Sequence, residues 1–125
     1  MATTEALTHI TSREQFEQAV NGGKPIIVDF WADWCQPCKM IVGPYATHAQ
    51  EKLRIGFYKL NIDEQPRLQW IAEWDAAHPE NQLSIRTIPL FIAFDGAGRQ
   101  LDRFSSAHPK QLNTFIEEVS ALARL

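Results

Sequence analysis

The first half of the chain combines helical and strand-like spacing of apolar residues. Residues 11–20 begin with a Thr-x-x-Glu capping box at Thr11 and place Phe16 and Val20 on one helical face. A β-branched and aromatic run follows at residues 26–32 and lacks polar alternation. Such a run is typical of a strand that is covered on both faces. The pattern therefore predicts a helix followed by a central strand.

The rest of the chain continues the alternation of strands and helices. Gly43 and Pro44 interrupt the next helical segment, and we expect a bend there because proline removes a backbone donor. Pro109 suits the first turn of a final helix whose apolar face runs to Leu122. The other predicted elements are a short first strand over 6–10, helices over 39–53 and 67–78, and strands over 55–62, 90–94 and 100–105.

The helix over 67–78 carries two apolar stripes. We expect Leu68, Ile71 and Ala72 to share one face. Trp70 and Trp74 lie four residues apart on a neighbouring stripe, where packing is a more common role than partner recognition.

Alternating strands and helices favour parallel pairing, whereas the closing hairpin adds antiparallel strands. The expected fold class is α/β, with a central mixed sheet flanked by helices on both faces. With 125 residues, the chain has the length of one domain, spanning 1–125.

Composition and charge exclude several functions. The chain has 12 Lys and Arg against 15 Asp and Glu, and no basic cluster dense enough to neutralise a run of phosphates. Nucleic acid is therefore not an expected partner. No apolar run approaches the roughly 18 to 20 residues that cross a bilayer, so no membrane is expected either. We expect a cytoplasmic monomer.

Two cysteines, Cys35 and Cys38, are the only ones in the chain. A secreted disulfide framework uses more cysteines, and a structural zinc site needs four ligands. Their spacing therefore indicates redox chemistry and no metal site. At the start of a helix, Cys35 would be an exposed nucleophile stabilised by backbone amides, and Cys38 would resolve the mixed disulfide. A copper or iron-sulfur carrier that shares the pair across a dimer is an alternative.

Three ordered motifs resemble those of the thioredoxin family. Residues 28–40 read VDFWADWCQPCKM and resemble the active-site strand and loop. Residues 59–63 read KLNID and resemble the next strand, and residues 85–89 read IRTIP and resemble the segment with the cis-proline. The resemblance covers nearly the whole chain. It implies a thioredoxin fold and dithiol-disulfide exchange without a bound cofactor.

The resemblance also implies roles for residues outside the cysteine pair. Asp29 matches the buried aspartate of the family, and in an apolar strand its pKa should rise so that it transfers protons. Lys59 matches the lysine that tunes this aspartate. Pro89 matches the cis-proline that holds the Ile88 backbone open for an extended substrate strand. The expected substrate-contacting residues are Trp34, Gln36, Pro37, Ile88, Pro89 and Ser105.

Several residues depart from the family pattern. Gln36 and Ser105 replace glycines, Leu90 replaces a threonine, Gly43 is an extra residue, and the segment 66–89 is longer. The changes at the rim predict altered docking with partners. No histidine lies between the cysteines, which favours a reductase over an oxidase.

We therefore expect a protein disulfide reductase. Its partners would be disulfide-containing proteins and a reductase or other dithiol electron donor. The alternative is a binding module or chaperone-like protein of the same fold whose CxxC is not its main activity.

Overall fold

The chain folds around one five-stranded mixed sheet with the strand order β1-β3-β2-β4-β5. The computed structural model describes residues 7–64 and 67–123. Strands β1, β3 and β2 pair in parallel, whereas β4 pairs antiparallel with β2 and β5 antiparallel with β4. The elements are β1 (Thr8–His9), α1 (Arg13–Val20), β2 (Ile26–Trp31), α2 (Gln36–Glu51), β3 (Gly56–Asn61), α3 (Arg67–Ala77), β4 (Leu90–Phe94), β5 (Gln100–Phe104) and α4 (Pro109–Leu122).

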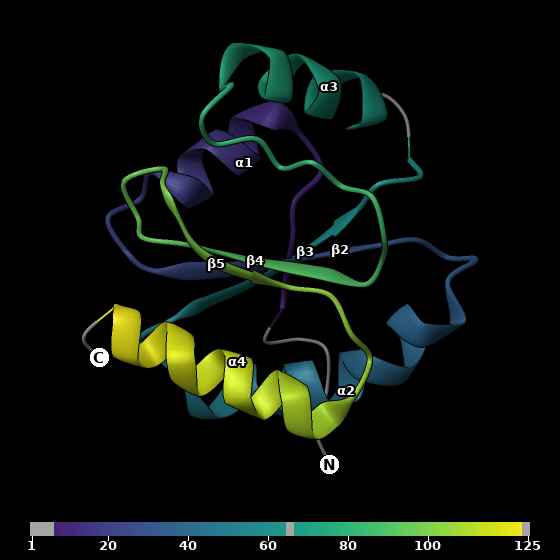
Figure 1. Ribbon diagram of the computed structural model, residues 1–125, viewed down its shortest axis with the longest axis vertical. Helices are drawn as coiled ribbons and strands as arrows, with labels where there is room; N and C mark the ends of the chain where they lie inside the picture. Colours follow the sequence, from purple (N-terminus) through teal and green to yellow (C-terminus); the bar gives the residue numbers. More distant parts are fainter. Residues whose placement is uncertain (1–6, 65–66, 124–125) are drawn as a thin grey trace.

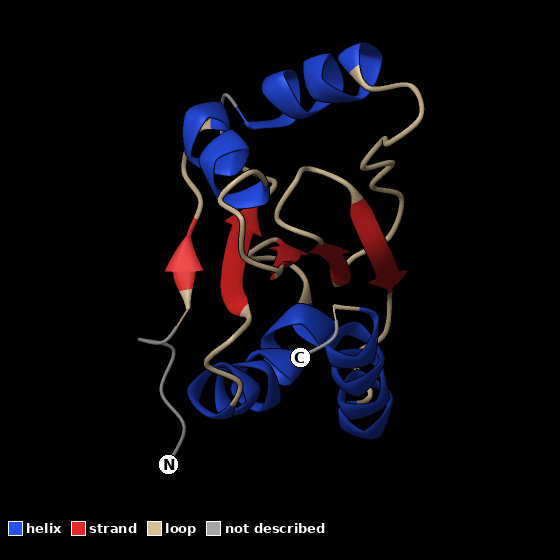
Figure 2. Ribbon diagram, turned by 90° about the vertical axis from the view of Figure 1, so that its left-hand side faces the viewer, coloured by secondary structure: helices blue, strands red, loops and turns tan. Residues whose placement is uncertain are grey.

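Helices cover both faces of the sheet, as the sequence predicts. In Figure 1, α1 and α3 lie above the strands and α2 and α4 lie below them. Figure 2 shows the same layers from the side. Because successive side chains of a strand point to opposite faces, β2 supplies Ile27 to the core under α2 and α4 and Val28 to the core under α1 and α3. The central strand is therefore buried on both faces.

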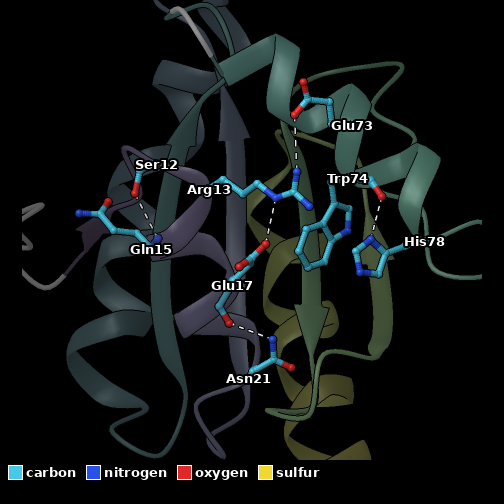
Figure 3. A network of polar contacts seen from close by, with 8 residues as sticks. All are labelled: Ser12, Arg13, Gln15, Glu17, Asn21, Glu73, Trp74 and His78. Atoms are coloured by element: carbon cyan, nitrogen blue, oxygen red, sulfur yellow. Dashed lines mark hydrogen bonds and ion pairs between the residues drawn. The ribbon is translucent and has the colours of Figure 1, made fainter.

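The predicted capping box places the start of α1 one residue too early, because its N-cap residue is Ser12 and not Thr11. The helix begins after Ser12, whose Oγ accepts a hydrogen bond from the backbone N–H of Gln15 at 3.1 Å (Figure 3). The side chain of Gln15 in turn accepts from the backbone N–H of Thr11 at 2.6 Å. Thr11 therefore precedes the cap. In the first strand, Ala6 lies outside the described residues.

The N-terminal end of α2 also differs from the prediction. The helix starts three residues before the predicted residue 39 and ends two residues before the predicted residue 53. Cys35 acts as its N-cap residue, so the helix includes Pro37 in its first turn, where a missing N–H costs no intrahelical bond. Pro44 lies inside the helix.

Two predicted packing faces are only partly correct. Ala72 is exposed and takes no part in the buried face of α3, and the side chain of Leu68 lies outside the described residues. In α4, the buried face ends at Val119, and Leu122 is 54% exposed. The buried side chains of α3 are Trp70, Ile71 and Trp74.

An aromatic cluster and an ion pair join α1 to α3. Phe16 contacts Trp70 and Trp74, with ring centroids 5.5 and 4.8 Å apart. Arg13 Nη1 lies 3.5 Å from Glu73 Oε2 (Figure 3). The two tryptophans are therefore core residues, in agreement with the packing role that the sequence favours.

Gly96 lies where the β4–β5 turn meets the loop before β2. Its φ is +90°, and a Cβ atom at this position would lie 2.7 Å from backbone atoms of Gly23 and Lys24. We expect Gly96→Ala to lower the free energy of unfolding by about 2 to 4 kcal/mol, because it combines backbone strain with a clash. Urea denaturation followed by circular dichroism measures this change.

Gly43 supplies the control for that experiment. It lies in α2, and a Cβ atom there would meet nothing within 4 Å. We expect Gly43→Ala to raise the free energy of unfolding by about 0.5 to 1 kcal/mol, since alanine is the better helix former. Equal effects of the two substitutions would contradict the close approach at Gly96.

Candidate active site

Several chain segments meet at one end of the sheet. The parallel strands β2 and β3 both end there, β4 begins there, and β5 ends there because it pairs antiparallel with β4. Reactive sites of open α/β sheets form outside the carboxyl ends of the parallel strands. The loop from β2 to α2, which carries the cysteines, leaves the sheet at this end (Figure 1).

Cys35 and Cys38 form a disulfide across the first turn of α2, with Cα atoms 5.3 Å apart. The backbone N–H of Cys38 donates a hydrogen bond to Cys35 Sγ at 3.2 Å. The first N–H groups of a helix have no intrahelical acceptor, and the helix dipole is positive at this end. Both effects stabilise negative charge on Cys35 Sγ, and they make this sulfur suitable as a nucleophilic thiolate.

The exposure of the two cysteines differs from our expectation. Cys35 is 4% exposed and Cys38 is 2% exposed, so in the disulfide form neither is the exposed partner. The rim beside them is exposed instead. Trp34 is 68% exposed, and Gln36 and Pro37 are also exposed at the start of α2. Exposure therefore does not distinguish the two sulfurs, whereas the helix cap does.

Asp29 lies in β2 and is completely buried, as the sequence predicts. Within the described residues, neither of its carboxylate oxygens has a hydrogen-bond partner. Burial raises the pKa of Asp29 to about 7, and the positive charge of Lys59 partly opposes this rise. Asp29 can therefore gain or lose a proton near neutral pH.

Lys59 is the partner of Asp29 in the parallel register of β2 and β3. Burial lowers the pKa of the Lys59 ammonium, whereas Asp29 and Asp33 raise it. Its Nζ atom lies 4.0 Å from the centroid of the Trp31 ring, within the range of a cation–π interaction. Trp31 therefore supports the charge of Lys59, a contact that the sequence did not reveal.

The turn before β4 completes the site. The Ile88–Pro89 peptide bond is cis, in agreement with the resemblance. Ile88 packs against the small apolar cluster that contains Cys35 and Cys38. In the part of the chain that the structure describes, the backbone N–H and C=O of Ile88 have no hydrogen-bond partner. Such groups are available to an added strand.

Ser105 follows β5 and lies beside this turn. Its Oγ donates to the backbone oxygen of Pro89 at 2.9 Å and lies 2.9 Å from Thr87 Oγ1. Thr87, which belongs to the IRTIP motif but was not among the predicted site residues, thus also lies near the site. The predicted site residues gather at this end of the sheet, except that Asp29 and Lys59 lie within the strands.

The remaining expectations concern metals and membranes. Across residues 7–64 and 67–123, no group of three or more His, Cys, Asp or Glu side chains is placed to hold a metal ion. In the same residues, no helix has both the length and the apolar character that a membrane span requires.

A cysteine pair that caps a helix at the end of this mixed sheet defines a thiol-disulfide oxidoreductase site. The sequence matches the Thioredoxin family over residues 7–118. It is 37% identical over 117 residues to the thioredoxin of Malassezia sympodialis, which covers 90% of this chain and 97% of that relative. It is 35% identical over 99 residues to the thioredoxin of Alicyclobacillus acidocaldarius subsp. acidocaldarius, covering 77% of this chain and 81% of that relative.

Solved structures agree with the sequence matches. The crystal structure of Malassezia sympodialis thioredoxin has a TM-score of 0.74 with this chain at 32% identity, covering 96% of this chain and 93% of that chain. The structure of Plasmodium falciparum thioredoxin also has a TM-score of 0.74, at 26% identity, covering 90% and 98%. The chain belongs to the thioredoxin family and is a dithiol-disulfide oxidoreductase. Nothing in the site favours the alternative of a binding module.

The pKa of Asp29 makes a prediction about stability. Its value is about 7 in the folded protein against an ordinary 3.8. Between these pH values the folded protein binds the additional proton, so stability falls as pH rises through this window. We expect Asp29→Asn to raise the free energy of unfolding by about 2 to 4 kcal/mol at pH 8 and by roughly half of that or less at pH 5.

Urea denaturation of the oxidised protein between pH 5 and pH 8 measures this effect. Glu117→Gln is the matched control, because Glu117 is an exposed carboxylate in α4, away from Asp29 and Lys59. Its effect should stay within about 0.5 kcal/mol at both pH values. A gain for Asp29→Asn that is equal at the two pH values would refute the raised pKa.

Proposed function

We propose that this oxidoreductase reduces disulfides in other proteins, with Cys35 as nucleophile and Cys38 as resolving cysteine. The observation that carries the proposal is the hydrogen bond from the Cys38 N–H to Cys35 Sγ at the helix cap. Only the sulfur at the cap receives this N–H and the positive end of the helix dipole.

The exchange takes place in two steps. The Cys35 thiolate attacks one sulfur of the substrate disulfide, the substrate S–S bond breaks, and the departing thiolate takes up a proton. The Cys38 thiol then loses its proton and attacks Cys35 Sγ, which forms the Cys35–Cys38 disulfide and releases the second substrate thiol. Two electrons and two protons pass to the substrate. A reductase or another dithiol returns them to the cysteine pair.

We assign the proton transfer of the second step to Asp29. A general base works best when its pKa lies near the working pH, and the pKa of Asp29 is about 7. Its unpartnered carboxylate oxygens support this role, because neither is committed to a hydrogen bond within the described residues. Lys59 tunes the reaction by holding the pKa of Asp29 below the value that burial alone would produce.

Substrate binding is assigned to the exposed rim and the turn before β4. The free backbone groups of Ile88 suit an extended segment that pairs with them as an added strand. Pro89 follows in the same turn. The exposed side chains of Trp34, Gln36 and Pro37 would cover the segment from the side of α2.

The same proposal places the protein in the cytoplasm as a monomer that carries electrons for cellular redox homeostasis. Its only two cysteines form the reactive pair, so it lacks the separate structural disulfides that oxidising compartments favour. Leu90 and Ser105 depart from the family pattern and lie at or beside the Ile88–Pro89 turn before β4. We therefore expect them to alter coupling to a reductase.

The assignment of the two cysteines predicts different outcomes for their serine variants. We expect Cys35→Ser to abolish reduction of a protein disulfide, because it removes the attacking sulfur. Cys38→Ser should instead accumulate a mixed disulfide, because the resolving sulfur is missing. Mass spectrometry after mixing each variant with oxidised insulin measures the adduct. An adduct on Cys38 in the Cys35→Ser protein would reverse the assignment.

The charge of Lys59 predicts a shift in the pH profile. Lys59→Met removes the charge that lowers the pKa of Asp29, so this pKa should rise above about 7. The pH at which release of the second substrate thiol reaches half its maximal rate should therefore increase. Stopped-flow measurement between pH 6 and pH 9 tests this shift.

Lys24→Met serves as the control for loss of a lysine, since Lys24 is exposed and lies before β2 at the other end of the sheet. Its pH profile should match that of the wild type. A profile that stays unchanged in the Lys59→Met protein would show that Lys59 does not tune the proton transfer.

A further inference from the structure

Ser105 connects the two residues that flank Ile88. Its Oγ donates to the Pro89 carbonyl oxygen and lies at the same 2.9 Å distance from Thr87 Oγ1. A serine hydroxyl has a single proton. Because Ser105 gives that proton to Pro89, the Thr87 hydroxyl must donate to Ser105 Oγ. The hydrogen bonds therefore run from Thr87 through Ser105 to Pro89, with Ile88 between the two ends.

Side chains of β5 also hold the segment that leads to this turn. Gln100 Nε2 donates to the backbone oxygens of residues 81–82 at 3.1 and 2.7 Å. Arg103 Nη2 donates to those of residues 83–84 at 2.7 and 3.1 Å. Residues later in β5 thus contact residues later in the segment 81–89, and Ser105 makes the last of these contacts.

A register shift makes this arrangement possible. The pairing of β4 with β5 is irregular between Ala93 and Phe94, and such a bulge changes the alternation of side chains. As a result Gln100 pairs with Phe94 and Arg103 pairs with Ile92, and both partners belong to the core under α1 and α3. Gln100 and Arg103 therefore face the same side, toward the segment.

Residues 85–89, which lie closer to the cysteines, depend on Ser105 for their hydrogen bonds. In the described part of the chain, both hydrogen bonds of residues 85–89 end on the Ser105 hydroxyl. These residues form neither helix nor strand. A backbone without such support samples more conformations. A partner that pairs with it binds more weakly, because binding must then offset the conformational entropy lost on ordering.

We propose that Ser105 is a positioning residue that fixes the backbone of Ile88 for pairing with the extended segment of a protein disulfide substrate. Thr87 orients the Ser105 hydroxyl for this task. The inference rests on the proposed use of Ile88 in substrate binding. It also changes the expected role of Ser105, which acts through Pro89 and Thr87. A glycine, the usual family residue here, offers no hydroxyl for such a contact.

The test compares a substrate that reaches Ile88 with one that is too small to do so. Reduced protein is mixed with increasing concentrations of insulin or of bis(2-hydroxyethyl) disulfide, and formation of the Cys35–Cys38 disulfide is followed in a single turnover. In Ser105→Ala, we expect the half-saturating insulin concentration to rise about three- to tenfold, the usual effect of one lost hydrogen bond. The ratio of insulin efficiency to small-disulfide efficiency should fall accordingly.

Matched variants separate positioning from a general structural effect. Ser105→Thr keeps the hydroxyl and should restore the ratio to within about twofold of the wild type. Ser106→Ala is the control, because the Ser106 hydroxyl contacts Gln111 and the backbone of His108 instead of the turn. Its ratio should equal that of the wild type.

Two further measurements address the proposed route through Thr87. Thr87→Val should raise the half-saturating insulin concentration, and its effect should not add to that of Ser105→Ala, because both remove one chain of hydrogen bonds. The NMR order parameters of the Thr87 and Ile88 backbone amides should fall in Ser105→Ala and stay unchanged in Ser106→Ala.

Several outcomes would overturn the inference. These are an unchanged half-saturating insulin concentration in Ser105→Ala, an equal loss with both disulfides, or the same loss in Ser106→Ala. If the wild type reduces neither disulfide, the proposed function itself fails, and this inference fails with it.

Discussion

Cys35 caps α2 with its sulfur atom, and this contact joins the fold to the chemistry. The first amides of a helix need an acceptor, and here the acceptor is the sulfur that we propose as the attacking atom. β2 determines where that cap lies, because it is paired on both sides and leads directly into the loop. The other parts of the site assemble around this point, since the strands on both sides of β2 direct their neighbouring loops to the same end of the sheet.

The buried carboxylate of Asp29 lowers stability above neutral pH, and its raised pKa suits the proton transfer that we propose for it. An ionised group without hydrogen bonds in a core is unfavourable, so protonation is favoured and the pKa of Asp29 moves to about 7. The same displacement lets the group transfer protons under neutral conditions. The positive charge of Lys59 limits the rise of the Asp29 pKa. The face of the Trp31 ring stabilises this charge inside the protein.

The residues that we propose for the chemistry and those that we propose for partner contacts lie in different parts of this molecule. The cysteines and Asp29 lie in or beside the central strand and α2, whose neighbouring side chains form the core. Ser105 lies at the rim and holds a coil segment through its hydroxyl alone. A single substitution there can change how firmly the Ile88 backbone is held while the cysteine pair keeps its helix cap.

Local sequence determined the features that depend on neighbouring residues. The apolar run of β2, the polar exception at Asp29 and the cysteine spacing at the start of α2 could be recognised without coordinates, because strand burial and helix capping depend on short stretches of chain. Competing local signals were harder to separate. Thr11 and Ser12 offer similar hydroxyl caps, and only the folded chain shows that Ser12 is used. The contact of Ser105 with Thr87 and Pro89 could not be predicted, since it joins residues 16 to 18 positions apart. A hydroxyl has many possible partners, and the tertiary approach of β5 to the segment before β4 decides which of them it meets.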